Sequence, residues 1–220
     1  MAKRCAKRES KQLRYKMFTG IVAGNFQVSD VEQRDEILAY GVALPDSLRE
    51  GLEIGASVSV DGVCQTVVKI EGSNVFFEAI PETCRVTTLE TLALGQKVNI
   101  ERSLTLGTEL GGHQLSGHVM TTGRVTQVTP LGEACDFEIS FDDKYENFVF
   151  EKGFIAMNGV SLTVGKLTLQ GCTLHLIPET LKITNLSQLK EGDLVNLEFD
   201  QQTVTIVQTV ERYLSKQSSS

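Results

Sequence analysis

The chain has 220 residues, which is enough for one or two domains, and 41% hydrophobic against 22% charged residues exclude wholesale disorder. A net charge of −7 argues against a nucleic-acid-binding protein, and no apolar run approaches the roughly 20 residues of a membrane helix. The cysteines are odd in number and lack CxxC spacing, so we expect reduced thiols in a cytoplasmic protein, without a disulfide framework or a zinc site. They are Cys5, Cys64, Cys84, Cys135 and Cys172.

The first 16 residues differ from the rest of the chain. They carry seven Lys or Arg and one acid, Glu9, so their net charge is 7 − 1 = +6. Such a segment is compatible with contact to nucleic acid or to an organelle import system. It is also compatible with a disordered leader or a start codon assigned too early. Because Met17 begins a fresh apolar segment, we expect residues 1–16 to be a basic disordered leader.

The remaining chain is one unit written twice at an offset of 97 residues. FTGIV at 18–22 matches LSGHV at 115–119, and DGVCQTV at 61–67 matches NGVSLTV at 158–164. The two other matching pairs are IPETCRVTTL at 80–89 with IPETLKITNL at 177–186, and LGQKVNIE at 94–101 with EGDLVNLE at 191–198. We therefore expect a first unit with its linker at 17–113 and a second unit at 114–200.

Each copy is predicted to be all-β. Short segments rich in Val, Ile, Phe and Thr alternate with turn signals at 61–62, 71–74 and 158–159, about ten residues apart, which indicates a small closed barrel. Residues 45–52 have a helical pattern with Asp46 or Ser47 as the expected cap, and 82–92 read as a short helix or an irregular excursion. At the end, Ile206, Val207, Val210 and Leu214 recur at helical spacing, so we expect an amphipathic helix within 201–216 that needs a packing partner.

The polar residues that repeat, among them Thr66 with Thr163 and Thr83 with Thr180, have two interpretations. They are either turn chemistry or a duplicated pocket, and the pattern alone does not decide between them. The copies also differ, since Cys64 is matched by Ser161 and Ile21 by His118. A buried cysteine is ordinarily a small core residue.

The histidines are unevenly distributed. His113 and His118 lie five residues apart in a glycine-rich turn, and the only other histidine is His175. Clustering in such a turn favours a functional role, whereas a lone histidine is ordinarily a satisfied surface or core group. No third ligand accompanies the pair, so we expect no metal site. The usual nucleotide-binding and hydrolase motifs do not occur in the sequence.

Several motifs taken together resemble the riboflavin synthase family, of the α-chain type with two lumazine-binding repeats. They are MFTGIV at 17–22, GGHQLSGHVMTTG at 111–123, the twins DGVCQTV and NGVSLTV, the two IPET blocks and TVERYL at 209–214. The resemblance covers residues 17–214. It implies an all-β chain of two tandem six-stranded Greek-key barrels with a C-terminal oligomerisation helix.

The resemblance also implies an activity. Two molecules of 6,7-dimethyl-8-ribityllumazine dismutate by transfer of a four-carbon unit, giving riboflavin and a ribitylamino-pyrimidinedione, without cofactor or metal. The family implies a homotrimer whose active site lies between the first barrel of one subunit and the second barrel of its neighbour, and association with lumazine synthase. Because the 7-methyl group is acidic, the main task of the protein is to orient two identical heterocycles.

Site residues follow by position from the family's motifs. The catalytic candidates are Ser57, Cys64, His113, His118 and Asp200. The substrate-binding candidates of the first barrel are Gly20, Ile21, Val22, Cys64, Gln65, Thr66, Glu78, Ala79, Ile80, Pro81, Glu82 and Thr83. Those of the second barrel are Gly117, His118, Val119, Lys152, Ser161, Leu162, Thr163, His175, Leu176, Ile177, Pro178, Glu179 and Thr180. Gln65 departs from the family pattern, since its twin is Leu162.

The alternative function belongs to a different class. Lumazine proteins and yellow fluorescent antenna proteins share this duplicated fold, bind one lumazine or flavin and catalyse nothing. That branch tends to lose the paired-histidine turn and the pocket residues of the second barrel. Because His113, His118, the second IPET block and the VERYL ending are present, the sequence favours the enzyme. A flavin-storage protein cannot be separated from it by sequence.

Overall fold

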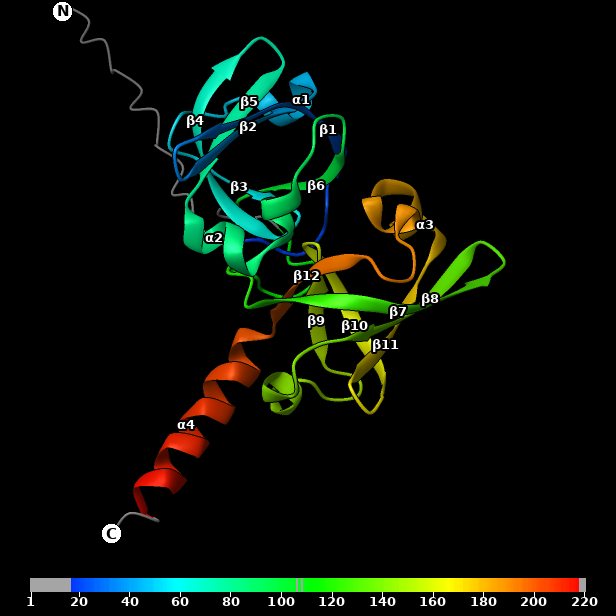
Figure 1. Cartoon of the computed structure of the whole chain (residues 1–220). Coiled ribbons are helices and arrows are strands. Elements are labelled where there is room, and N and C mark those ends of the chain that lie inside the picture. Colours follow the sequence, from blue (N-terminus) through cyan, green and yellow to red (C-terminus); the bar gives the residue numbers. More distant parts are fainter. Residues whose placement is uncertain (1–16, 106, 108, 218–220) are drawn as a thin grey trace, which may run out of the picture.

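The computed structural model describes residues 17–105, 107 and 109–217. The basic segment 1–16, with Cys5, lies outside these residues, so its prediction is not tested. The described chain forms two closed antiparallel barrels of six strands each, followed by a helix (Figure 1). This confirms the predicted fold class. No helix among the described residues is both long and apolar enough to cross a lipid bilayer.

The first barrel closes in the order β1-β2-β5-β4-β3-β6. Its strands are β1 (Gly24–Arg34), β2 (Ile37–Ala43), β3 (Ser57–Val60), β4 (Val63–Glu71), β5 (Asn74–Ala79) and β6 (Lys97–Arg102). The second barrel repeats this plan with β7 (Thr121–Leu131), β8 (Ala134–Ser140), β9 (Phe154–Met157), β10 (Val160–Leu167), β11 (Gly171–Leu176) and β12 (Leu194–Phe199). Strands β3 and β4 are joined by the two residues Asp61 and Gly62, both at positive φ, as their Asp-Gly turn signal predicts.

Each barrel has its own apolar core because the strands alternate inward and outward side chains. In β4, Val63, Gln65 and Val67 are buried, whereas Thr66 between them is exposed. The larger core side chains of the first barrel include Tyr40 and Phe77, and those of the second include Phe137 and Phe199. Cys135 and Cys172 are buried free thiols of the second barrel, consistent with a core role.

Short helices close the barrel ends. The segment 82–92 is helical, in α2 (Pro81–Val86) and the 3-10 turn η1 (Thr88–Thr91), and its counterpart is α3 (Pro178–Ile183) with η3 (Asn185–Gln188). Helix α1 (Asp46–Arg49) is shorter than predicted. Its cap prediction was wrong: Pro45 occupies the N-cap position and no side chain caps the helix. Arg49 instead bonds the carbonyls of Leu44 and Gly72, which anchors this turn to the barrel.

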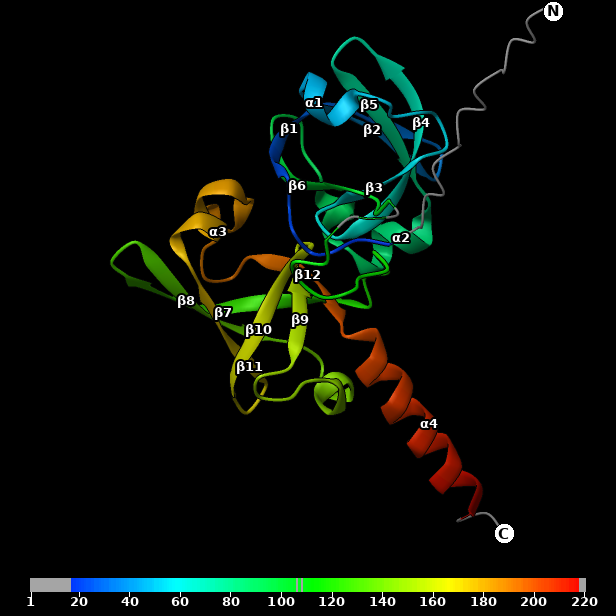
Figure 2. The same cartoon turned by 180° about the vertical axis from the view of Figure 1, so that it is seen from behind.

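Helix α4 (Gln201–Gln217) confirms the predicted C-terminal helix and projects away from both barrels (Figures 1 and 2). It packs on the second barrel through buried Val204 and partly buried Val207, and Glu211 accepts a hydrogen bond from Nδ2 of Asn147 at 3.2 Å. The other apolar residues of the stripe, Ile206, Val210 and Leu214, are at least half exposed. The predicted apolar stripe is therefore split. Val207 packs on the core of the second barrel, and the other three residues face solvent.

The two barrels meet through a polar network with approximate twofold symmetry. Asn99 donates from Nδ2 to the carbonyl of Asn158, and its twin Asn196 donates to the carbonyl of Asp61. Each asparagine also accepts a backbone N–H from the opposite copy, at Asn185 and at Thr88. These buried groups satisfy one another across the interface, so the network fixes how the barrels are oriented.

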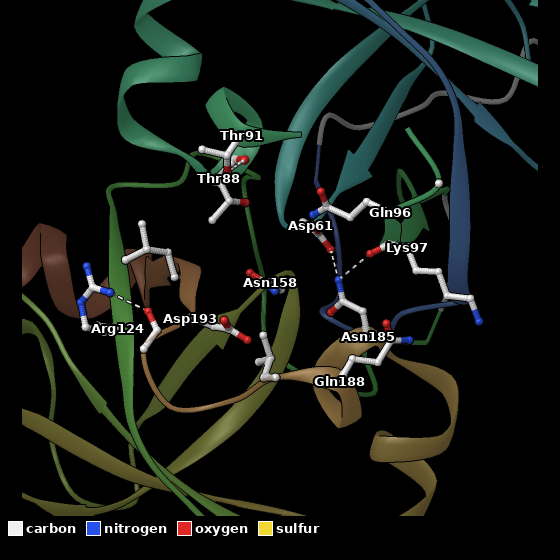
Figure 3. Close-up of a pocket in the computed structure, with 14 residues that line it drawn as sticks. Asp61, Thr88, Thr91, Gln96, Lys97, Arg124, Asn158, Asn185, Gln188 and Asp193 are labelled. Atoms are coloured by element: carbon white, nitrogen blue, oxygen red, sulfur yellow. Dashed lines mark hydrogen bonds between the residues drawn. The ribbon is translucent and has the colours of Figure 1, made fainter. Parts of the chain in front are cut away.

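The network contains one carboxyl, Asp61, where its twin is Asn158 (Figure 3). Its Oδ1 accepts from the backbone N–H of Asn99 at 2.7 Å and from Nδ2 of Asn185 at 2.9 Å. Burial raises the pKa of Asp61 to about 7, despite the opposing effect of these two hydrogen bonds. A groove with a volume of about 660 Å³ lies beside this carboxyl, between the two barrels.

The first prediction concerns the pH dependence of stability. Because the pKa of Asp61 is higher in the folded chain than its ordinary 3.8, the folded state binds more protons between about pH 4 and 7. Stability contributed by Asp61 is therefore lost as the pH rises through this window, by at most about 4 kcal/mol. We expect Asp61→Asn to raise the free energy of unfolding at pH 8 and to flatten its pH dependence.

Urea unfolding of the wild type and the variant at pH 5 and pH 8 measures this effect. Burial also raises the pKa of Glu101 and Glu198, so the difference between the two proteins isolates Asp61. An asparagine fits the geometry, since Asn158 has a similar positive φ and accepts from Asn196 as Asp61 accepts from Asn99. A variant less stable than the wild type at pH 8 would contradict the prediction.

Candidate active site

Several of the predicted site residues lie on the outward faces of three neighbouring strands in each barrel. In the first barrel, Ser57 of β3 pairs with Thr66 of β4, and Ser59 pairs with Cys64. In the second barrel the equivalent pair is Phe154 of β9 with Thr163 of β10. Glu78 and His175 are the exposed residues on the third strands, β5 and β11. The two faces therefore share one backbone plan and differ in side chains.

The segments that precede the barrels are exchanged between these faces. The carbonyl of Gly117 accepts from the backbone N–H of Cys64 at 2.8 Å, and the carbonyl of Gly20 accepts from the N–H of Ser161 at 2.9 Å. Val22 packs into the core of the second barrel, and Val119 packs on that of the first. The structure thus places Gly20 and Val22 against the second barrel and Gly117 and Val119 against the first, whereas each segment was predicted to line the pocket of its own barrel.

Two glycines make the exchange possible. Gly20 and Gly117 have φ values of +75° and +74°, a conformation that side-chain-bearing residues rarely adopt. A Cβ on Gly117 would lie 2.6 Å from the Cβ of Cys64, and one on Gly20 would lie 2.5 Å from the Cβ of Ser161. The segments are joined by an antiparallel bridge between Phe18 and Leu115, with mutual hydrogen bonds of 2.8 and 3.0 Å.

Two buried carboxylates, missed in the sequence analysis, hold these glycine turns. Glu101 accepts from the backbone N–H groups of Thr19 and Gly20 at 2.6 and 3.0 Å. Its twin Glu198 accepts in the same way from Ser116 and Gly117 at 2.7 and 3.0 Å. Burial raises the pKa of both carboxyls, and these bonds oppose that change. The sequence signal was that both final repeat blocks, KVNIE and LVNLE, end in glutamate.

His113 belongs to the second-barrel face. Its Nδ1 lies 2.6 Å from Oγ of Ser161, and its ring stacks on Phe154 at a centroid distance of 5.0 Å. Burial lowers the pKa of His113, and the nearby charge of Asp200 opposes this in part. Its Nε2 is buried and has no hydrogen-bond partner among the described residues. A polar nitrogen left without a partner is expected at a site that a ligand completes.

Asp200 lies beside His113 at the start of α4. Its Oδ2 accepts from the backbone N–H and the hydroxyl of Thr203, both at 2.8 Å, so the carboxylate caps the helix. Asp200, His113 and Phe154 also line one pocket of about 720 Å³, together with Ile206 of α4. The structure therefore brings together the predicted residues His113, Ser161 and Asp200.

His118 has different surroundings from His113. It is exposed, its backbone N–H donates to Oγ of Ser116, and it directly follows Gly117 beside Cys64. The predicted pair of histidines is thus divided between the two faces of one chain.

Other predicted binding residues have side chains that do not face these surfaces. Gln65, Ala79, Leu162 and Leu176 are buried inside the barrels, because strand alternation directs them inward. Of these residues, the backbone atoms are the part placed for contact with a ligand on the outer face. Cys64, between Val63 and Gln65, is half-buried on the outward side.

The IPET runs form the first turns of α2 and α3, with Pro81 and Pro178 at the first helical positions. Glu82 pairs with Arg85 at 2.7 Å and Glu179 with Lys182 at 3.7 Å, all on the surface. The carbonyls of Thr83 and Thr180 accept hydroxyl groups of Thr87 and Thr184. Ile80 and Ile177 are exposed just before the helices, beside the proposed binding faces. Lys152 is exposed, and its backbone N–H donates to the carbonyl of Val164.

Known proteins share this duplicated architecture. The lumazine binding domain family matches the chain twice, at residues 19–103 and 116–200. The crystal structure of LumP complexed with riboflavin has a TM-score of 0.77 and 28% identity, covering 83% of this chain and 98% of LumP. LumP complexed with 6,7-dimethyl-8-(1'-D-ribityl) lumazine gives a TM-score of 0.75, with 28% identity over 82% of this chain and 98% of LumP. The chain therefore consists of two tandem lumazine binding domains.

Sequence relatives narrow the class further. The riboflavin synthase of Escherichia coli strain K12 is 43% identical over 90% of this chain and 94% of its own length. That of Chlamydia pneumoniae is 37% identical over 90% of this chain and 98% of its own length. The chain belongs to the riboflavin synthase family.

A prediction about the exchange follows from Gly117. Adding a methyl group there combines backbone strain of roughly 1–2 kcal/mol with a direct clash against Cys64. We expect Gly117→Ala to lower the melting temperature and to displace the 116–119 segment from the first-barrel face. Gly132→Ala is the matched control, since Gly132 also has a positive φ but nothing lies within 4 Å of its added Cβ. An equal loss of melting temperature in both variants would refute the close contact between Gly117 and Cys64.

Proposed function

We propose that this chain catalyses the riboflavin synthase reaction. Two molecules of 6,7-dimethyl-8-ribityllumazine exchange a four-carbon unit, which gives riboflavin and 5-amino-6-ribitylamino-pyrimidinedione. The observation that carries the proposal is the duplicated outer face, which provides one site per barrel for two copies of the same substrate. The identity of 43% to a riboflavin synthase over nearly the whole chain supports it. Catalysis then depends mainly on orienting two heterocycles against each other.

The two faces are similar enough to hold one ligand and different enough to give it two roles. One lumazine donates carbon and the other accepts it. The first face offers the thiol of Cys64 and the hydroxyl of Ser57 for nucleophile addition or proton movement, consistent with the higher nucleophilicity of a thiol. The second offers Ser161 hydrogen-bonded to His113, with Asp200 nearby. We assign proton transfer to His113 and to His118 of the opposite face.

Bringing the two bound lumazines face to face requires more than one chain. In the proposed homotrimer, the first barrel of one subunit faces the second barrel of its neighbour, and α4 joins the subunits. The exposed side chains of Ile206, Val210 and Leu214 supply the apolar surface for this contact. A cytoplasmic location and association with lumazine synthase belong to the same proposal.

A function in ligand binding alone is the second candidate. It is favoured by the likeness to LumP, whose structures are complexes with a lumazine, riboflavin and flavin mononucleotide. The two candidates differ in one observable property, the formation of riboflavin.

Incubation of the full chain with 6,7-dimethyl-8-ribityllumazine decides between them. We expect the lumazine to be consumed and riboflavin absorbance to rise to half of the starting molar amount of lumazine, because two substrate molecules give one riboflavin and one pyrimidinedione. Turnover should persist with EDTA present, since the proposed reaction uses no metal. Stable binding of the lumazine without riboflavin would establish the binding protein instead, and complete loss of turnover with EDTA would refute the metal-free reaction.

The assembly makes a separate prediction. Burying a large apolar side chain stabilises an interface by about 1.5–3 kcal/mol, so Val210→Asp should dissociate the assembly. We expect the variant to bind lumazine, because each face is formed within a single chain, and to lose most turnover. Sedimentation and turnover at matched protein concentration measure both effects, with the exposed Gln208→Asp as a control on the same helix. Full turnover in a dissociated variant would place both reacting ligands on one chain.

A further inference from the structure

A histidine–aspartate pair lies on the outer face of the second barrel. His175 of β11 is the direct cross-strand partner of Asp136 of β8, and its Nδ1 lies 2.6 Å from Oδ1 of Asp136. A carboxylate oxygen accepts hydrogen bonds, so it favours the tautomer with hydrogen on Nδ1. In the neutral ring, Nε2 is then an acceptor. The side chain of His175 is 57% exposed, which leaves it accessible to a ligand.

A glycine makes room for this ring. Gly165 of β10 lies under His175, and a Cβ there would be 2.7 Å from Nε2 of His175 and 2.4 Å from Oγ1 of Thr173. Because φ of Gly165 is outside the left-handed region, the backbone does not require glycine. The close approach of the ring and of Thr173 is the reason for it. Thr163, a predicted ligand contact, is two residues away on the same face of β10.

The first barrel lacks all three features. The residues at the positions equivalent to Asp136, Gly165 and His175 are Ala39, Val68 and Glu78. Glu78 lies 3.8 Å from the guanidinium of Arg34, an exposed ion pair of little energetic weight. One face therefore presents a carboxylate and the other an oriented imidazole.

We propose that Asp136 is a positioning residue that fixes His175, so that Nε2 of His175 accepts a hydrogen bond from the ribityllumazine bound on the second barrel. The donor is a hydroxyl of the ribityl chain or an N–H of the pyrimidinedione edge. This contact distinguishes the second site from the first, where Glu78 occupies the equivalent position. The inference rests on the proposed function, since it assigns a contact to the same substrate.

The test uses the full chain and titrates 6,7-dimethyl-8-ribityllumazine by fluorescence, resolving two sites per chain. Loss of one oriented hydrogen bond weakens binding by roughly three- to tenfold. We expect Asp136→Ala to raise the dissociation constant of one site by this factor and to leave the other unchanged. Asp136→Asn, which keeps an oxygen acceptor, should restore most of the affinity. Glu71→Ala, which removes the exposed Lys69–Glu71 pair, is the matched control.

A spectroscopic measurement separates orientation from stability. The chain has three histidines, so ¹⁵N spectra of the imidazoles are assignable with His175→Gln. We expect Asp136→Ala to shift the tautomer balance of His175, and ligand addition to move its Nε2 signal in the wild type. A lower melting temperature with both dissociation constants and the His175 signals unchanged would overturn the proposal. So would equal weakening of both sites.

The outcome is separable from that of the proposed reaction. If the wild type binds the lumazine without forming riboflavin, the catalytic proposal fails and the two dissociation constants still decide this one. If the wild type forms riboflavin while His175→Gln leaves both constants unchanged, the contact is refuted and the reaction stands.

Discussion

The close backbone contact at Gly20 and Gly117 is the constraint on which the site depends. Each glycine places its carbonyl on an N–H of the other copy, at Ser161 and at Cys64. Neither glycine leaves room for a side chain at this contact. Each turn is held by a buried carboxylate of the same copy, Glu101 for Gly20 and Glu198 for Gly117. Each binding face is therefore composite, with strands from one copy and a leading segment from the other. Neither copy would present the same face if it were separated from its twin.

This composite arrangement explains how a symmetric frame supports an asymmetric reaction. The glycines, the glutamates and the interface asparagines repeat in both copies and fix the geometry. The substitutions lie on the surfaces that this frame presents, such as Cys64 for Ser161 and Ala39 for Asp136. Differences at these positions change the chemistry offered to a ligand without moving the backbone that holds it. Two identical substrate molecules can then meet unlike partners in similar orientations.

The sequence predicted the fold well because the information was local and duplicated. An offset of 97 residues, the spacing of turn signals and the final helical period were sufficient for two closed barrels and α4. The exchange could not be predicted in this way, because an offset between copies is the same whether a segment packs on its own barrel or on the other. Val22 and Val119 are apolar in either case, and only the three-dimensional contacts assign them to opposite cores.

Transfer of site residues by motif had a related limit. A motif includes every consecutive residue, whereas a strand presents only alternate side chains to one face. Gln65 and Leu162 were therefore included with Cys64 and Ser161, although they point into the barrels. Asp136 was missed because it belongs to no repeated block, and only its pairing across β8 and β11 places it beside His175.

Asp200 connects this site to the surface that α4 leaves exposed. The carboxylate caps the first turn of the helix and lines the pocket that contains His113. Val204 and Val207 fix the same part of the helix to the second-barrel core, while the apolar residues beyond them extend into solvent. In the proposed assembly, another subunit would pack on an element whose start contributes to the His113 pocket. Order imposed on the helix by that assembly would also restrict the position of Asp200 beside the imidazole, so the proposed association and the geometry of the site depend on the same short segment of chain.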